Sequence, residues 1–158
     1  MGPLGGLLGY LLRRAQLAVF EDFIEAFAPL RLRPAQFSAL IVIDRNPGRS
    51  QAEIAEALGI ARPNFVAMMD ELERRGLAAR AVSSVDRRTH ALMLTDAGRR
   101  LLKRALQVVA KHETRVCGAL STAEREMMVR LLHRLVGTPA AALIGAPAPA
   151  LRAAKPKD

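Results

Sequence analysis

The sequence predicts a mainly α-helical fold with one small β-hairpin, in which a helix-turn-helix is followed by a wing. Three observations support this prediction. Apolar residues recur at three- and four-residue steps over most of the chain, as they do on one face of a helix. Two short helical segments are joined by a glycine, and two extended segments joined by a polar turn follow them. Aromatic residues make up only 4% of the chain, so the core is aliphatic, and such a core suits packed helices.

The first two helices are predicted from their apolar spacing and from their ends. Residues 4–28 have the periodicity of one long helix. Its apolar stripe consists of Leu8, Leu12, Ala15, Val19, Phe23, Ala26 and Leu30. The second helix opens at Pro34, because proline suits a first helical turn, and it ends before the turn at residues 46–48.

The next two helices form the predicted helix-turn-helix. Ser50 and Glu53 have the spacing of a capping box, which opens a helix that ends at Gly59. The following helix has Pro63 in its first turn and Gly76 as its left-handed C-terminal cap. The motif buries or crowds Ile54, Ala55, Leu58, Ile60, Phe65 and Met68, and it requires a positive φ at the turn glycine. The side chains expected to pack against the core also include Val66, Met69 and Leu72.

A β-hairpin and a fifth helix follow. Residues 78–83 and 90–94 are predicted to be extended, with a polar turn at residues 84–89 between them. Thr95 is the expected N-terminal cap of a long helix that reaches about Gly118.

A sixth helix and a tail complete the chain. Ser121 and Glu124 form a second capping box, which opens a helix that ends near Val136. Ala, Pro and Gly dominate after that, so residues 138–158 are predicted to be a flexible tail.

Positive charge is concentrated around the predicted hairpin. The chain has 24 basic and 15 acidic residues, which gives a net charge of +9 and an isoelectric point near 11.1. Nine basic residues and two acidic ones lie between Arg74 and Arg104. Such a balance favours a polyanionic partner, either nucleic acid or anionic lipid. A basic stretch beside a helix-turn-helix favours nucleic acid.

The segment from Asp86 to Gly98 has the pattern D-x-R-x-x-x-L-x-L-T-x-x-G. Together with the preceding helix-turn-helix, this pattern resembles the MarR family of multiple-antibiotic-resistance-type regulators over about residues 5–136. The resemblance implies a winged helix-turn-helix on a helical dimerisation frame, and a homodimer that binds a palindromic double-stranded DNA operator. Residues 1–32 and 112–137 would then form the dimerisation region, and residues 33–111 the DNA-binding region.

The resemblance also implies which residues contact DNA. Arg88 would insert into the minor groove, whose negative potential attracts arginine, and Asp86 would brace the wing arginines. Arg87 matches a variable position, and we infer a phosphate contact from its charge. Arg62 and Asn64, in the first turn of the recognition helix, have the hydrogen-bonding groups that pair with guanine and adenine. Pro63 and Ala67 are positioned to touch thymine methyl groups, while Arg62 has phosphate as its alternative partner.

Family members commonly bind a small aromatic or anionic effector between the frame and the DNA-binding lobe. The candidate effector residues here are Tyr10, Phe20, Phe23, Phe27 and Phe37, with Arg13 and Arg14 as cations. Aromatic walls with a few cations suit an aromatic acid or an acyl-CoA thioester. Residues 9–16 are similar to the start of members that control hydroxycinnamate catabolism through CoA thioesters. In the alternative interpretation, the phenylalanines are core residues and the arginines lie at the surface.

Other functions have little support in the sequence. It contains no Gly-rich phosphate loop, no nucleophile elbow and no paired metal-ligand motif, so we expect no enzymatic activity, cofactor or metal ion. Cys117 leaves a redox-sensing regulator as one alternative, because Lys111 and Arg115 lie close by in sequence, although a lone cysteine is usually a small buried hydrophobe. Two further alternatives are an architectural DNA binder without an effector and a protein-interaction module.

The cellular location is predicted from the cysteine and the N-terminus. A single cysteine forms no disulfide within one chain, which favours the cytoplasm. In a signal peptide the basic residues come before the apolar run, whereas here the arginines follow the apolar residues 1–12. This apolar run is also too short to span a bilayer. We therefore expect a cytoplasmic, ligand-responsive regulator with no membrane partner, and we favour a repressor over an activator.

Overall fold

The computed structural model describes residues 3–82 and 90–137. Within them the chain forms six α-helices, two short 3-10 helices and a two-stranded antiparallel sheet, which confirms the predicted fold class. In chain order the elements are η1 (Pro3–Gly6), α1 (Leu8–Phe27), η2 (Ala28–Leu30), α2 (Pro34–Arg45), α3 (Gln51–Ala57), α4 (Arg62–Arg74), β1 (Ala78–Val82), β2 (His90–Leu94), α5 (Asp96–Val116) and α6 (Thr122–Val136). The predicted tail, residues 138–158, lies outside the described residues.

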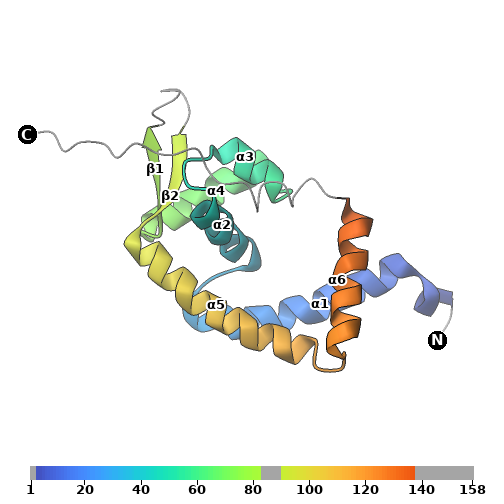
Figure 1. The fold of residues 1–158 in the computed structure, drawn as a ribbon. Coiled ribbons are helices and arrows are strands. Elements are labelled where there is room, and N and C mark those ends of the chain that lie inside the picture. The colour runs from blue at the N-terminus through green and yellow to red at the C-terminus, as the bar shows by residue number, and fades with distance from the viewer. Residues whose placement is uncertain (1–2, 83–89, 138–158) are drawn as a thin grey trace, which may run out of the picture.

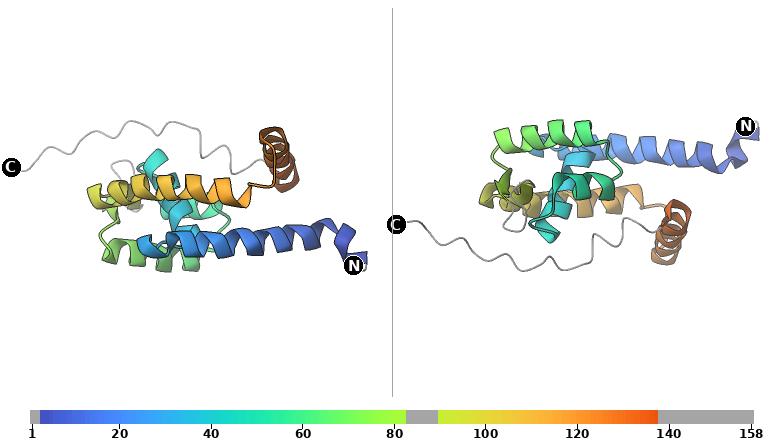
Figure 2. Two further views of the ribbon diagram at one scale, coloured as in Figure 1. Left: turned by 90° about the horizontal axis from the view of Figure 1, so that it is seen from below. Right: turned by 90° about the horizontal axis from the view of Figure 1, so that it is seen from above.

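The structure has two parts: a frame, formed by α1, α5 and α6, and a lobe, formed by α2, α3, α4 and the hairpin. α1 and α5 lie side by side along much of their length (Figures 1 and 2). α6 lies apart from them, and it borders one cavity together with the N-terminal half of α1. α2, α3, α4 and the hairpin gather at the other end of the frame, where α2 packs against both α5 and β2. The core lies in this lobe and at its contact with α1 and α5. Its fully buried side chains include Phe27, Leu40, Ile43, Ile54, Phe65, Met69, Leu72, Leu92 and Ala105.

Local sequence signals set most element ends. The Ser50 and Ser121 side chains accept hydrogen bonds from the backbone N–H groups of Glu53 and Glu124, so both predicted capping boxes are present. Thr95 caps α5 by accepting a hydrogen bond from the Gly98 N–H at 3.0 Å. The first helix starts later than predicted, at Leu8, because the Pro- and Gly-containing residues before it form η1 instead.

Candidate nucleic-acid interface

The helix-turn-helix packs as its spacing predicts. Ile54 of α3 and Phe65 of α4 are fully buried, and Ala55 is buried where the two helices cross. Leu58, Ile60 and Met68 are half-buried against the same core. Gly59, in the turn between the helices, has a φ of 62°, so the predicted positive φ is confirmed. The sequence of α3 and α4 therefore fixes which side of α4 faces solvent.

The solvent-exposed side of α4 carries the predicted base-contacting residues. Arg62, Pro63, Asn64 and Ala67 are all exposed. The expectation that Val66 packs against the core is wrong, because its side chain is 40% exposed. Val66 lies one turn after Arg62 on the same flank of the helix, while Phe65, Met69 and Leu72 fill the buried side. The first two turns of α4 thus present polar and small apolar groups together.

Arg80 braces the wing against the helix-turn-helix. Its guanidinium, on β1, forms an ion pair with Asp70 at 2.7 Å and another with Glu73, and it donates to Gln51 Oε1 at 3.3 Å. The Arg80 backbone N–H also donates to Glu73 at 2.8 Å. The charge of Arg80, which the sequence places among the basic residues around the hairpin, is therefore compensated within the lobe. It fixes β1 relative to α3 and α4.

The part of the wing pattern within the described residues, from Leu92 to Gly98, has a structural explanation. Leu92 and Leu94 are buried on one face of β2, and β2 pairs with β1 in a register that places Ala78 opposite Leu94. Thr95 caps α5 and also donates from Oγ1 to the Gly76 carbonyl at 2.6 Å. Gly98 packs against the backbone of Leu77, and a Cβ built on it would lie 1.9 Å from the Leu77 carbonyl oxygen. These contacts join the hairpin to α5.

The tip of the wing lies outside the described residues. Asp86, Arg87 and Arg88 belong to it, so their DNA contacts remain predictions. The register of β1 and β2 places Val82 opposite His90, at the base from which this tip extends.

The candidate effector residues do not form one group. Phe23, Phe27 and Phe37 pack together in the core, with ring centroids 3.8 Å apart for Phe23 and Phe27 and 5.1 Å apart for Phe27 and Phe37. Phe27 is 0% exposed, whereas Phe20, two turns earlier on the same face of α1, is 44% exposed. Within one protomer, therefore, only part of the predicted set is accessible to a ligand.

The other candidate effector residues lie on the N-terminal half of α1. Arg14 donates to the Tyr10 hydroxyl at 3.4 Å, and Arg13 is exposed beside it. From Tyr10 to Phe23 the helix rises about 20 Å, so one small ligand does not span both ends.

A buried histidine that the sequence analysis did not single out joins α1 to α5. His112 is 2% exposed; its Nδ1 lies 2.6 Å from Asp22 Oδ1, and its ring meets Phe23 edge-on at 5.4 Å. Arg115 donates to both oxygens of Asp22, at 3.0 and 2.7 Å. Hydrogen bonds from Arg115 and then His112 lower the pKa of Asp22 from 3.8 to about 2. A cavity of about 550 Å³ lies beside this cluster, lined by Asp22, Glu25, Ala26, Val108, Lys111 and Arg115.

Comparison with known proteins identifies the family. The MarR family profile matches residues 32–89. The chain is 36% identical, over 135 residues, to a putative transcriptional regulatory protein for the hcr operon of Thauera aromatica; the match covers 85% of this chain and 81% of the relative. The chain belongs to the MarR family. It is therefore a DNA-binding transcriptional regulator, as the sequence predicts.

Two solved structures of one MarR-type repressor are similar to the whole described chain. The repressor CouR bound to a 23-mer DNA duplex is 54% identical, with a TM-score of 0.84, and the match covers 87% of this chain and 97% of CouR. CouR bound to p-coumaroyl-CoA is 52% identical, with a TM-score of 0.80 and the same coverage. The predicted resemblance to the hydroxycinnamate-linked branch of the MarR family is confirmed.

A large apolar surface on the frame suits the homodimer of a MarR regulator. Every side chain of α6 is at least partly exposed within one protomer, and α6 and α1 border an apolar cavity of about 880 Å³. Its lining includes Leu8, Leu12, Val19, Met127, Met128, Leu131 and Leu135. An isolated soluble chain rarely exposes so much contiguous apolar surface, whereas a two-fold interface buries it.

Cys117 gives the redox alternative little support. The thiol is half-buried at the C-terminal cap of α5. Arg115 is close to it in sequence and was a candidate to activate it, but its guanidinium is paired with Asp22. Among residues 3–82 and 90–137, no three His, Cys, Asp or Glu side chains are arranged to hold a metal ion. No helix in that part of the chain has the length and hydrophobicity of a membrane span.

Proposed function

We propose that the protein is a homodimeric repressor that binds a palindromic operator and leaves it when a hydroxycinnamoyl-CoA thioester binds. The observation that carries this proposal is the similarity of the whole described chain to CouR, which has been captured both with DNA and with p-coumaroyl-CoA. The exposed polar turn at the start of α4 and the charge of the wing support the DNA half of the proposal. We expect the protein to act in the cytoplasm and without catalysis.

In the DNA complex, we assign base contacts to the exposed side of α4. Arg62 and Asn64 hydrogen-bond base edges in the major groove, and Pro63, Val66 and Ala67 contact thymine methyl groups. In the neighbouring minor groove, Arg88 inserts at the tip of the wing, Asp86 braces it and Arg87 meets a phosphate. The brace from Arg80 supports this assignment because it holds the wing at a fixed angle to α4.

For the effector, we propose direct contacts from the accessible members of the predicted set: the half-buried Tyr10 and the exposed Arg13, Arg14 and Phe20. Guanidinium groups bind phosphates through charge-assisted hydrogen bonds, so Arg13 and Arg14 suit the phosphates of CoA. Phe23 and Phe27 of α1 pack with Phe37 of α2, and these contacts set the position of α1 relative to the lobe. We expect CoA thioesters to bind more tightly than the free acids.

The DNA half is tested by letting the protein select its operator from random duplexes. We expect a palindrome with half-sites about one helical turn apart, bound by a dimer with an affinity that falls steeply with salt. Arg62→Ala and Asn64→Ala should relax the base preference by about 1–3 kcal/mol per contact. Selection of no palindrome, or an affinity indifferent to salt, would count against a homodimeric repressor.

The effector half is tested by thermal shift with p-coumaroyl-CoA, CoA and p-coumarate. A ligand that binds the folded state raises the melting temperature, and we expect the thioester to raise it most. Arg14→Ala and Phe20→Ala should reduce that rise, whereas Arg45→Ala, an exposed arginine on α2, should not. An unchanged melting temperature with all three compounds would leave an architectural DNA binder as the better description.

A further inference from the structure

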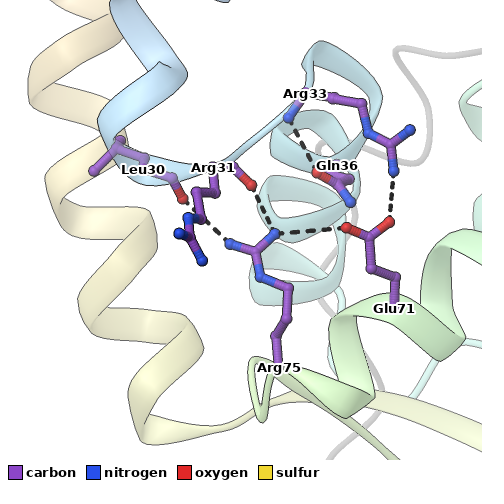
Figure 3. Close-up of polar contacts among 6 residues, drawn as sticks. All are labelled: Leu30, Arg31, Arg33, Gln36, Glu71 and Arg75. Atoms are coloured by element: carbon purple, nitrogen blue, oxygen red, sulfur yellow. Dashed lines mark hydrogen bonds and ion pairs between the residues drawn. The ribbon is translucent and has the colours of Figure 1, made fainter.

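The C-terminal end of the recognition helix is fastened to the joint between the frame and the lobe (Figure 3). Arg75, the C-terminal cap of α4, donates from Nη1 to the Arg31 carbonyl at 2.7 Å and from Nη2 to the Leu30 carbonyl at 3.2 Å. These carbonyls belong to the short segment that connects α1 to α2. One side chain therefore ties the helix that reads DNA to the end of the helix that forms the frame.

Glu71, one turn earlier on α4, reinforces this tie. Its carboxylate accepts from Arg33 at 2.5 Å and lies 4.0 Å from Arg75. Gln36, which is almost fully buried, and then Arg33 lower the pKa of Glu71, so this carboxylate is charged at neutral pH. Gln36 also accepts a hydrogen bond from the Arg33 backbone N–H at 3.0 Å. The last two turns of α4 are thus held at two points to residues 30–33.

The joint itself has a fixed conformation. Arg31 has a φ of 51°, and it is the non-glycine residue that adopts a left-handed backbone among the described residues. Leu30 and Leu32, on either side of it, are buried in the core. A joint anchored on both sides transmits a movement of α1 to whatever is attached to it, because its backbone has little freedom to absorb that movement.

We propose that Arg75 is a positioning residue for operator binding, which sets the angle of α4 to the frame and so the spacing of the two recognition helices in the homodimer. The inference rests on the proposed function in taking the operator to be palindromic. From Asn64 to Arg75 the helix rises about 16 Å, so a tilt of a few degrees at Arg75 moves the reading end by about 1 Å. Hydrogen bonds to base edges tolerate only a few tenths of an ångström.

A role in folding alone does not account for this arrangement. Phe65, Met69 and Leu72 already bury the inner side of α4 in the core, and Arg80 fixes its other flank to the wing. Arg75 is 25% exposed and contacts backbone carbonyls that lie outside the helix-turn-helix. Its loss should therefore loosen the angle of α4 more than it lowers the stability of the lobe.

The test compares two operators, one with the selected half-site spacing and one with a base pair inserted at its centre. We expect the parent protein to prefer the selected spacing by at least tenfold. In Arg75→Ala this ratio should fall several-fold, with Arg75→Lys between the two because lysine keeps one donor. Arg74→Ala is the matched control, since Arg74 is exposed at the same helix end. It removes the same charge and should leave the ratio unchanged.

The outcomes are separable. A preference in Arg75→Ala equal to that of the parent would overturn the positioning role while leaving the proposed function intact. A parent that binds no palindrome would instead remove the proposed function. If Arg75→Ala does not fold, Glu71→Gln weakens the same tie and should lower the ratio in the same direction. Circular dichroism and sedimentation confirm that each variant tested is a folded dimer.

Discussion

Gly98 of α5 packs against the backbone of Leu77, the residue before β1. Since an added Cβ would lie 1.9 Å from the Leu77 carbonyl oxygen, Gly98→Ala forces α5 or β1 to move. We expect a loss of about 1–3 kcal/mol in the free energy of unfolding, or more, as for other overpacked sites. Urea denaturation measures it, and Gly9→Ala is the control, because its added Cβ would meet nothing within 4 Å beyond the adjacent residues and the nearby backbone of its own helix. Equal stability of the two variants would refute the close contact.

The sequence predicted residues whose signals are local. Capping serines, turn glycines and the buried positions of the helix-turn-helix follow from spacing within a few residues. Val66 was misjudged because it lies at the edge between the buried and exposed sides of α4, where an apolar side chain suits either. The sequence places Arg80 among the basic residues around the hairpin but does not reveal its ion pairs, because Asp70 and Glu73 come together with it only when β1 folds back along α4.

At the scale of elements, Asp22 ties α1 to α5 through two partners. Because its pKa falls from 3.8 to about 2 on folding, the charged carboxylate stabilises the protein fully above about pH 4. This contribution is lost as the pH falls through about 2. We expect Asp22→Asn to unfold at a lower temperature than the parent at pH 7, with a difference that shrinks between pH 4 and pH 2.

Thermal unfolding followed across this pH range provides the measurement. Asp44→Asn is the control, because Asp44 is an exposed carboxylate at the end of α2, with no ion pair among the described residues. A difference for Asp22→Asn that stays constant from pH 7 to pH 2 would contradict the ion pairs. The cluster itself was invisible to sequence analysis, since Asp22 and His112 are 90 positions apart and no periodic pattern connects them.

At the scale of the whole molecule, we expect a second copy of the chain to cover the apolar surface between α1 and α6. Leu131 of α6 is half exposed in one protomer and borders the apolar cavity with α1. We expect Leu131→Glu to raise the dissociation constant of the dimer at least tenfold, or about 1.4 kcal/mol, and to weaken operator binding with it. Sedimentation velocity measures the dimer, with Glu126→Gln on the same helix as the control. A dimer unaffected by Leu131→Glu would place the interface elsewhere.

The apolar stripe of the first helix showed that the helix exists but not what covers it. Its C-terminal part packs into the core of the same protomer, while Leu8, Leu12 and Val19 line the cavity with α6. Periodicity gives the same signal for an apolar face that packs in the core and for one left exposed in the protomer, so the boundary between the two required the structure. For the same reason, the predicted effector set mixed core phenylalanines with exposed residues of α1.

The central claim is that effector binding and operator binding oppose each other in one homodimer. The most direct measurement is the fluorescence anisotropy of a labelled operator complex titrated with p-coumaroyl-CoA at fixed salt. We predict that the thioester weakens operator binding by about 5- to 150-fold, a coupling of about 1–3 kcal/mol, and that CoA and p-coumarate at equal concentration release far less DNA. The account would be contradicted by a complex that stays intact at thioester concentrations which saturate the thermal shift, or that CoA alone releases equally well.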